Sequence, residues 1–422
     1  MSTTGTPTTT GDLSELPDML APELIADPYR GYGRLREQAP VLRASFMGAG
    51  LTWMVTRYAD VHAVLGDPKF VNNPASVPGM QVPNPVEKLM ESFGLSEEDA
   101  RFLGENILSS DPPDHARLRK LVSRAFTVRR VGELRPRVEE ITSGLLDGLA
   151  AGSEPVDLVE RFCYPLPITV ICELVGIPEA DRPAWRDWGR AMVSMDPKRM
   201  PPALHGMVAS VQALIEVRRS APGDDLLTAL IRAHDDGDRL SDEELTTFVV
   251  TLVMAGHETT AHLLGNSVAA LLAHPDQLAL LGERPELWPT AVNELVRCCG
   301  TALLTGLRYA AEDVRLGDVL IKAGESVSPI LVAANFDPRQ YTDPDRLDVT
   351  RQPVGRGEGH VGFGHGAHYC LGAALARQEA EVALHALFDR FPRLALAVPE
   401  SELVWQPVPG SRRLERLPVT LR

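Results

Sequence analysis

Cysteines, aromatic residues and long hydrophobic runs are scarce in this sequence. Its 422 residues include five cysteines, and aromatic residues make up 5% of the chain. So few cysteines in so long a chain do not build the disulfide framework of a small secreted domain, and we expect a reduced, cytoplasmic protein. Because no stretch supplies the roughly 18 consecutive apolar residues that cross a bilayer, the sequence predicts no membrane span.

Positive charge is in short supply too. The chain carries 42 lysines and arginines against 57 aspartates and glutamates, and its net charge is −15. Such a surface does not attract phosphates in general, so we expect no nucleic-acid partner. A local basic patch that receives an acidic partner remains compatible with this balance.

The N-terminal stretch "MSTTGTPTTTGDLSELPDML" is polar and rich in threonine. It has neither the basic start nor the apolar core of a signal peptide. We expect residues 1–26 to form a disordered tail. No repeat, linker or composition break divides the remainder, so residues 27–422 are expected to form one domain, with a monomer as the default.

The hydrophobic pattern is mainly helical. Apolar residues recur with a period of 3.6 at residues 136–150, 203–218 and 371–391. Strand-like pieces are few and short, and they lie at residues 51–55, 319–321 and 327–331. The last two flank "KAGE", a turn signal, and predict a small hairpin. The expected fold class is therefore mainly α with a small β portion.

The longest apolar run lies at residues 240–273. Ser241 and Glu244 form an S-x-x-E capping box that opens a helix there, and a His-Pro pair closes it. The run is apolar nearly all round, which is typical of a helix that crosses the core. Gly256 in its middle costs about 1 kcal/mol relative to alanine, and a buried, unpaired Glu258 would cost more. Such costs indicate a functional segment, with a packing contact at a kink as the alternative.

The stretch "AGHETTAH" in this run comes close to the zinc-protease pattern H-E-x-x-H. Zinc ligands on a helix stand four residues apart, which places them about 40° apart on one face. His257 and His262 stand five apart, which separates them by about 140°. No third ligand follows at a suitable distance, so we do not expect a zinc hydrolase.

A second informative stretch is "FGHGAHYCLGAALAR". Its glycines Gly364, Gly366 and Gly372 let a loop take left-handed conformations and let its backbone approach a large flat group. Cys370 precedes a strongly helical run, where the helix dipole and free N–H groups favour a thiolate. A thiolate serves as a nucleophile or as a metal ligand. His368 is the nearby candidate base, but no Cys-His enzyme pattern matches, whereas a thiolate ligand suits haem iron and O–O cleavage.

This stretch resembles the haem-binding loop of the cytochrome P-450 superfamily, F-G-x-G-x-x-x-C-x-G. The resemblance extends over nearly the whole chain from about residue 27. It implies that family's fold, a triangular prism of helices with a long central helix over the haem and small β-sheets. It also implies haem b as the cofactor, Cys370 as the axial iron ligand, and Phe363, Gly364 and Gly372 as haem-binding residues.

Further motifs follow in the family's order. His115 and Arg119 in "DPPDHARLRKLVSRAF", Arg308 in "GLRYAAEDV" and His368 match residues that bind the haem propionates. Each alone is an ordinary surface charge. Cationic donors around two carboxylates make charge-assisted hydrogen bonds, so the resemblance implies a propionate site built from three chain segments.

The stretch "AGHETT" resembles the oxygen-activating segment of the family's central helix. Ala255 and Gly256 would leave room for O2 beside a local break in the helix. Glu258 and Thr259 would be the acid–alcohol pair that delivers protons for O–O cleavage. The alternative for Thr259 is an ordinary hydroxyl bonded to its own helical turn. The two histidines are then expected to be structural.

"NELVR" supplies Glu294 and Arg297, which resemble the family's E-x-x-R pair. On an isolated helix such a pair is worth roughly 0.3 kcal/mol. In the family it is buried and locked to an arginine from a later loop. The candidate for that third member is Arg346 in "TDPDRLD", and the implied role of the network is structural.

The activity that the resemblance implies is O2-dependent oxidation of a bulky, mostly apolar small molecule. Because the sequence resembles actinobacterial enzymes of secondary metabolism, we expect hydroxylation or epoxidation of a macrolide polyketide, with steroid, terpenoid or xenobiotic hydroxylation as the alternative. A non-catalytic haem-thiolate sensor needs no acid–alcohol pair, and peroxide-driven relatives typically lack the threonine. The implied substrate pocket draws on residues 71–106, 194–205, 250–254, 302–306 and 407–411.

Electrons would come from a ferredoxin and a ferredoxin reductase, since the chain carries no flavin or nicotinamide domain. A basic cluster would steer the acidic ferredoxin, and its members are Arg117, Arg119, Lys120, Arg124, Arg129 and Arg130. The alternative is that these residues form an ordinary solvated helix face.

Overall fold

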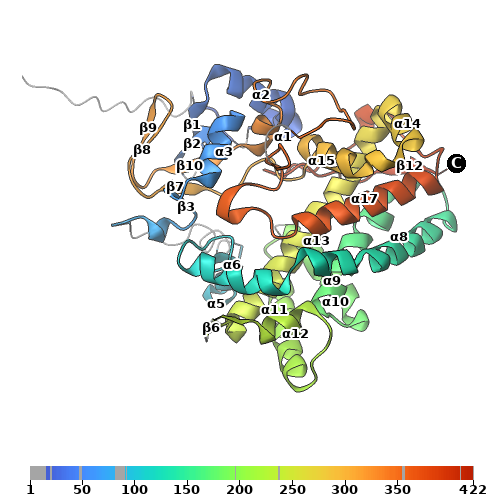
Figure 1. Ribbon diagram of the computed structural model, residues 1–422, viewed down its shortest axis with the longest axis horizontal. Helices are drawn as coiled ribbons and strands as arrows, with labels where there is room; N and C mark the ends of the chain where they lie inside the picture. Colours follow the sequence, from blue (N-terminus) through green and yellow to red (C-terminus); the bar gives the residue numbers. More distant parts are fainter. Residues whose placement is uncertain are drawn as a thin grey trace, which may run out of the picture.

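The computed structural model describes residues 16–19, 21–46, 50–80, 91, 93–194, 196–235, 238–353, 357–408 and 410–421. Helices surround one long central helix in this part of the chain. The five-stranded sheet lies on the left in Figure 1, and the strand Pro418–Thr420 of a smaller sheet lies on the opposite side. The expected class, mainly α with a small β portion, is confirmed. None of the described helices is long and apolar enough to cross a membrane.

The helices are α1 (Pro22–Ala26), α2 (Pro28–Gln38), α3 (Tyr58–Gly66), α5 (Glu97–Gly104), α6 (Asp114–Ala125), α7 (Val128–Glu133), α8 (Arg135–Ala150), α9 (Pro165–Val175), α10 (Arg182–Val193), α11 (Met200–Ser220), α12 (Leu226–Arg232), α13 (Asp242–Ala273), α14 (Pro275–Glu283), α15 (Trp288–Cys299), α16 (Leu331–Asn335) and α17 (Ala373–Arg390). The strands are β1 (Val41–Ser45), β2 (Leu51–Val55), β3 (Phe70–Val71), β4 (Val156–Asp157), β5 (His234–Asp235), β6 (Asp238–Arg239), β7 (Arg308–Ala310), β8 (Val314–Leu316), β9 (Val319–Ile321), β10 (Ser326–Pro329), β11 (Ala395–Leu396) and β12 (Pro418–Thr420).

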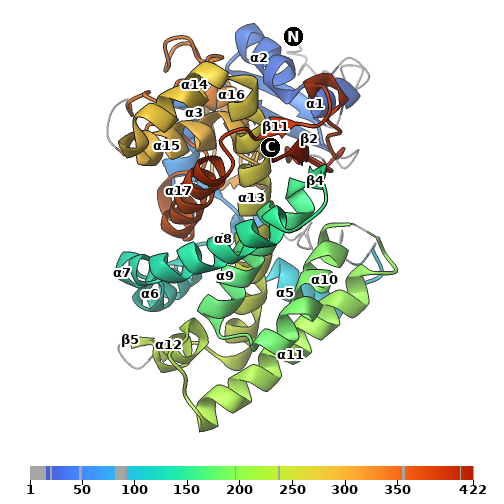
Figure 2. The same ribbon diagram turned by 90° about the vertical axis from the view of Figure 1, so that its right-hand side faces the viewer.

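The predicted central helix is α13, and both of its ends lie where the sequence places them. The Ser241 hydroxyl accepts the Glu244 N–H at 3.1 Å, and the Glu244 carboxylate accepts the Ser241 N–H at 2.8 Å, so the capping box is complete. His274 caps the other end. Figure 2 shows α13 running through the middle of the molecule, where it packs against α9, α11, α15 and α17.

The local break expected beside Gly256 is absent, because α13 is a continuous α-helix from Asp242 to Ala273. A Cβ added at Gly256 would lie 3.5 Å from the side chain of Ile171 on α9, which is ordinary contact. A side chain the size of alanine would therefore fit here, and Gly256 neither bends α13 nor is required for its packing against α9.

The small hairpin predicted between residues 319–321 and 327–331 is wrong. β9 pairs with the preceding β8 around Gly317, whose φ of 59° suits a glycine in a tight turn. β10 instead lies parallel to β2, with Val327 opposite Trp53, in a sheet of order β1-β2-β10-β7-β3. Pairing with a strand about 270 residues earlier in the chain therefore overrides the local turn signal.

The expected boundary of the tail at residue 26 is also corrected. Met19 and Leu24 are buried against the core, Pro22–Ala26 form α1, and the Tyr32 hydroxyl donates to the Met19 carbonyl at 3.3 Å. Two apolar side chains in an otherwise polar stretch are enough to dock it. Residues 1–15 and 20 lie outside the described residues.

Glu379 is a buried acid on α17, and no charged group pairs with it among the described residues. It is 2% exposed, its Oε2 has no hydrogen-bond partner in the described part of the chain, and burial raises its pKa to about 8. The folded protein therefore keeps this proton at a pH where the unfolded chain has lost it, so stability falls as pH rises from about 4 to about 8.

Replacing Glu379 by Gln removes this titration while keeping the size of the side chain. We expect Glu379→Gln to be more stable than the parent at pH 8, by on the order of 4 kcal/mol, and close to it at pH 4.5. Urea unfolding at both pH values measures the difference. Equal stability gains at both pH values would show that burial does not hold the proton on Glu379.

Candidate functional site

The cysteine loop is held closed by its own backbone. The Cys370 N–H donates to the Phe363 carbonyl at 2.9 Å, just after the turn Gly366–His368. Gly364 and Gly366 both have φ of 72°, and a Cβ at Gly366 would lie 2.4 Å from the Leu65 carbonyl oxygen. The left-handed conformations predicted for the loop are thus present at these two glycines.

Gly372 differs from the other two glycines, since its φ is −83° and it caps α17. The Cys370 side chain is exposed, yet it lies deep enough that burial raises the pKa of its thiol. The Gly372 N–H, the Arg119 charge and the Ala373 N–H lower that pKa, but less than burial raises it. The N–H groups at the helix terminus thus lower the pKa of the Cys370 thiol as expected, but burial raises it by more.

The four predicted propionate-binding residues converge from three elements. His115 and Arg119 stand one turn apart on α6, Arg308 begins β7, and His368 ends the turn before Cys370. The rings of His115 and His368 lie 4.0 Å apart, and Arg119 donates to the Tyr369 carbonyl at 2.8 Å. Burial, followed by the charges of His115, Arg308 and Arg119, lowers the pKa of His368 to about 3.

This cationic cluster has the chemistry of a site for carboxylates. Arg308 is buried at 6% exposure, and its Nε has no hydrogen-bond partner in the described part of the chain. The acid whose charge acts on it is Asp111. The Asp111 carboxylate already accepts two backbone N–H groups, from Asn72 and Asn73, and the Ser76 hydroxyl. Two propionates would therefore supply acceptors that these cations lack, and the residues fit haem.

Asn72 is a site residue that the sequence did not reveal. Its Nδ2 lies 2.5 Å from Nε2 of His368, and its N–H donates to Asp111 at 2.8 Å. No local pattern marks this asparagine, since it reaches the loop only because β3 ends beside it. It lies near the start of segment 71–106 of the implied substrate pocket, of which residues 81–90 and 92 are outside the described residues.

One face of α13 lacks the packing found along the rest of the helix. Ala255 and Thr259, one turn apart, are exposed in the middle of an otherwise largely buried helix. The Thr259 hydroxyl donates to the Ala255 carbonyl at 2.7 Å, as in an ordinary helix, and the Thr301 hydroxyl donates to the Thr259 carbonyl at 2.9 Å. The arrangement offers a small residue and an accessible hydroxyl side by side.

Glu258 is buried at 3% exposure among groups that stabilise its charge. His262 Nε2 lies 3.2 Å from Oε2, His257 Nε2 lies 3.6 Å from Oε1, and Arg413 Nη1 lies 3.7 Å from Oε2. Burial raises the pKa of Glu258, but the hydrogen bonds and charges of the two histidines outweigh it and hold the pKa below its usual range. Glu258 is therefore a carboxylate at neutral pH.

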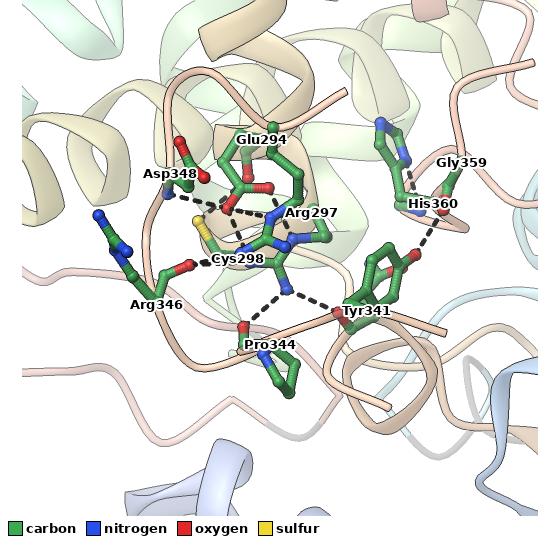
Figure 3. Close-up of polar contacts among 12 residues, drawn as sticks. Glu294, Arg297, Cys298, Tyr341, Pro344, Arg346, Asp348, Gly359 and His360 are labelled. Carbon is green, nitrogen blue, oxygen red and sulfur yellow. Dashed lines mark hydrogen bonds and ion pairs between the residues drawn. The ribbon is translucent and has the colours of Figure 1, made fainter. Parts of the chain in front are cut away.

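The buried pair Glu294 and Arg297 is present, but its third member is not the predicted one (Figure 3). Arg297 binds Glu294 through two hydrogen bonds of 2.7 and 2.8 Å, and both side chains are about 2% exposed or less. Arg351 Nε binds Glu294 Oε1 at 3.0 Å. Arg346 contributes its backbone carbonyl, which accepts from Arg297 at 3.4 Å, because the loop turns its backbone toward the pair.

This correction predicts unequal effects for the two arginines. Arg351→Ala leaves part of the buried Glu294 charge uncompensated and removes hydrogen bonds to loop carbonyls, so we expect a loss of about 3 kcal/mol. Arg346→Ala keeps its backbone carbonyl and should cost roughly 0.5 kcal/mol or less. Urea unfolding of both variants measures this, and equal losses would contradict the assignment.

The six basic residues on and after α6 do not share one surface. Arg119 lies in the cationic cluster, and Arg117 pairs with Glu244 of α13. Lys120, Arg124 and Arg129 are exposed, and Arg130 lies 3.8 Å from Asp224. A docking face therefore contains fewer of these residues than the sequence indicates.

A helical fold with a glycine–cysteine loop, a cationic cluster beside it and a buried Glu–Arg pair defines a haem-thiolate class of protein. The family model described as Cytochrome P450 matches residues 204–283 and 286–400. The chain is 43% identical to the 6-deoxyerythronolide B hydroxylase of Saccharopolyspora erythraea, over 97% of this chain and 100% of that protein. It therefore belongs to the cytochrome P450 family of monooxygenases, and the resemblance seen in the sequence is confirmed.

Two further relatives indicate the kind of cytochrome P450 that this chain resembles. The chain is 42% identical to the mycinamicin IV hydroxylase/epoxidase of Micromonospora griseorubida, over 89% of this chain and 90% of that one. The crystal structure of the LnmA cytochrome P450 hydroxylase from the leinamycin pathway of Streptomyces atroolivaceus matches with a TM-score of 0.82 and 43% identity, over 92% and 95% of the two chains. These relatives act in macrolide or other secondary-metabolite biosynthesis.

Proposed function

We propose that this cytochrome P450 hydroxylates or epoxidises a macrolactone-type polyketide. The observation that carries the site is the convergence of two arginines and two histidines beside the exposed Cys370. The substrate class rests on the relatives named for 6-deoxyerythronolide B and mycinamicin IV. A steroid, terpenoid or xenobiotic is the alternative substrate.

The cysteine loop and the cationic cluster would hold haem b. Cys370 would ligate the iron, and Phe363, Gly364 and Gly372 would line the same face of the group. His115, Arg119, Arg308 and His368 would bind its propionates, which relieves their mutual repulsion. Haem bound in this way supplies activation of O2 and insertion of one oxygen atom into the substrate.

Around that group, α13 supplies space and protons. Ala255 leaves room beside its exposed face, and the Thr259 hydroxyl can exchange its bond to the Ala255 carbonyl for a bond to a proton acceptor. Glu258 is the adjacent buried carboxylate that would pass protons to this hydroxyl. Thr301 holds the Thr259 carbonyl, so the helix keeps its position while the hydroxyl turns.

Electrons would come from a ferredoxin and a ferredoxin reductase. The exposed Lys120, Arg124 and Arg129 would form the docking face for the acidic partner. The alternative is that these residues form an ordinary solvated helix face that does not bind ferredoxin. A KM for ferredoxin that rises with salt concentration would contradict this alternative.

A binding and turnover panel tests the substrate class. The holoenzyme is mixed with 6-deoxyerythronolide B, mycinamicin IV, a steroid and a monoterpene, and we record haem absorption shifts and the masses of the products. We expect the macrolactones to bind at least about tenfold more tightly than the others, equivalent to roughly 1.4 kcal/mol. Preference for the steroid or the terpene would replace the macrolactone proposal by its alternative.

A further inference from the structure

The two histidines of "AGHETTAH" differ in how the protein holds them. His257 is fixed on both ring nitrogens, since Nδ1 lies 2.5 Å from the Val253 carbonyl and Nε2 lies 3.0 Å from the Tyr164 hydroxyl. A Cβ at Gly189 would lie 2.7 Å from its Nε2, so α10 packs directly on the ring. These hydrogen bonds and this packing give His257 a structural role.

One ring nitrogen of His262 contacts Glu258, and the other has no hydrogen-bond partner among the described residues. Its Nε2 binds Glu258 Oε2 at 3.2 Å, but its Nδ1 is buried without a hydrogen-bond partner in the described part of the chain. The whole residue is 4% exposed. A buried polar atom left without a partner costs about 1–3 kcal/mol, so a nitrogen kept in this state needs an explanation.

The next residue along the same face repeats the pattern. Asn266 stands one turn beyond His262, and its Nδ2 donates to the Cys299 carbonyl at 3.1 Å and to the Arg412 carbonyl at 3.0 Å. Its Oδ1 is buried and has no partner among the described residues. Glu258, His262 and Asn266 therefore form a polar row at i, i+4 and i+8 inside an otherwise apolar helix.

Free polar atoms lie at each step of this row. Glu258 Oε1, His262 Nδ1, Asn266 Oδ1 and Arg412 Nε are all buried, and none of them has a hydrogen-bond partner among the residues that the structure describes. Arg412 also reaches the protein surface, where its Nη1 donates to the Ala26 carbonyl at 3.2 Å. Buried polar atoms without a protein partner are typically satisfied by ordered water molecules, which carry protons between them.

We infer that His262 is a proton relay that supplies Glu258 along this row from the side of the C-terminal segment. A proton arrives at Nδ1 while the Nε2 proton moves to Glu258 Oε2. Rotation of the resulting carboxylic acid group presents that same proton to the next acceptor, and its loss returns Glu258 to a carboxylate. The ring then returns to its first tautomer by proton exchange with water. One proton enters and one leaves, and no electrons move. The inference rests on the proposed function of Glu258.

The other charged groups around Glu258 do not offer this path. Tyr164 bonds to His257, its ring lies under Arg190, and burial raises its pKa above the usual range. The Arg413 guanidinium has only donors and no acceptor that could receive a proton. Among the described neighbours of Glu258, His262 is thus the group with one nitrogen on Glu258 and a second nitrogen without a protein partner.

His262→Gln tests the relay. Gln keeps a donor near the position of Nε2 but cannot move a proton between two nitrogens. The holoenzyme oxidises styrene in two ways, with NADPH, ferredoxin, its reductase and O2, or with iodosylbenzene, which delivers an oxygen atom without any proton. Styrene is the probe because it does not depend on the macrolactone proposal, and O2 uptake is recorded in every assay.

We expect His262→Gln to lower the O2-driven rate about tenfold or more and to change the pH profile and the H2O/D2O ratio of that rate. The iodosylbenzene-driven rate should stay within about twofold of the parent's. The matched control is His274→Gln, which replaces a half-buried histidine at the end of the same helix that bonds to the Ala270 carbonyl. It should leave both rates unchanged.

Three results would overturn the relay. The first is a His262→Gln variant whose O2-driven rate and pH profile equal those of the parent. The second is an equal loss of rate in both assays, which indicates a packing defect. The third is a Glu258→Gln variant that keeps the parent's rate while His262→Gln is slow. A parent protein without iodosylbenzene-driven oxidation would instead contradict the proposed haem site. A parent that oxidises styrene but no macrolactone would leave the relay standing and remove the proposed substrate.

Discussion

Cys370→Ser is expected to abolish both monooxygenase activity and the absorption spectrum of thiolate-bound haem. A serine hydroxyl is not ionised near neutral pH and is a poor ligand for iron. A thiol, by contrast, releases its proton when its sulfur binds the metal as a thiolate. The substitution is close to isosteric, and the loop hydrogen bond from residue 370 to the Phe363 carbonyl involves the backbone, so the loop should keep its shape. Absorption spectroscopy and turnover of the purified variant measure the effect.

Cys298→Ser is the control for this experiment. The Cys298 thiol donates to the Glu294 carbonyl at 3.0 Å, and a serine hydroxyl can do the same. We expect this variant to retain the spectrum and the activity of the parent. If Cys370→Ser kept turning over, the assignment of Cys370 as the iron ligand would be wrong.

Thr259→Ala is expected to uncouple the enzyme, so that electrons from NADPH leave mainly as hydrogen peroxide and product per NADPH falls about tenfold. Thr259 carries a hydroxyl on the exposed face of α13, next to the buried Glu258. Removing it interrupts proton delivery without disturbing the helix, because its hydroxyl bonds only within its own turn. Product and peroxide are measured in the same reaction.

The neighbouring threonine provides a matched control. Thr260 is buried, and its hydroxyl donates to the Gly256 carbonyl at 3.0 Å, so it has the same chemistry on a different face. We expect Thr260→Ala to keep the coupling of the parent. Wild-type coupling in Thr259→Ala would mean that the hydroxyl is an ordinary helix hydroxyl, the alternative that the sequence left open.

The sequence predicts those parts of the molecule that depend on local rules. The capping box at Ser241, the end of α13 at His274 and the left-handed conformations of Gly364 and Gly366 are local features. Each follows from side chains or backbone conformations within a few residues, and the structure has all of them.

The parts that the sequence misplaced depend on distant partners. Whether 327–331 pairs with its neighbour or with β2 is decided by the sheet. Whether Arg346 or Arg351 reaches Glu294 is decided by how the loop between them turns. Tyr164, which fixes His257, and Arg413, which lies beside Glu258, likewise come from distant segments, so no pattern in α13 alone separates the fixed His257 from the open His262.

The most direct measurement is the absorption difference spectrum of the reduced protein with and without carbon monoxide. The account predicts a strongly red-shifted Soret band, which arises when a thiolate lies opposite the carbon monoxide on haem iron. A protein that binds haem yet gives a band typical of a histidine or water ligand would contradict it, because the cationic cluster would then hold haem while Cys370 does not ligate the iron.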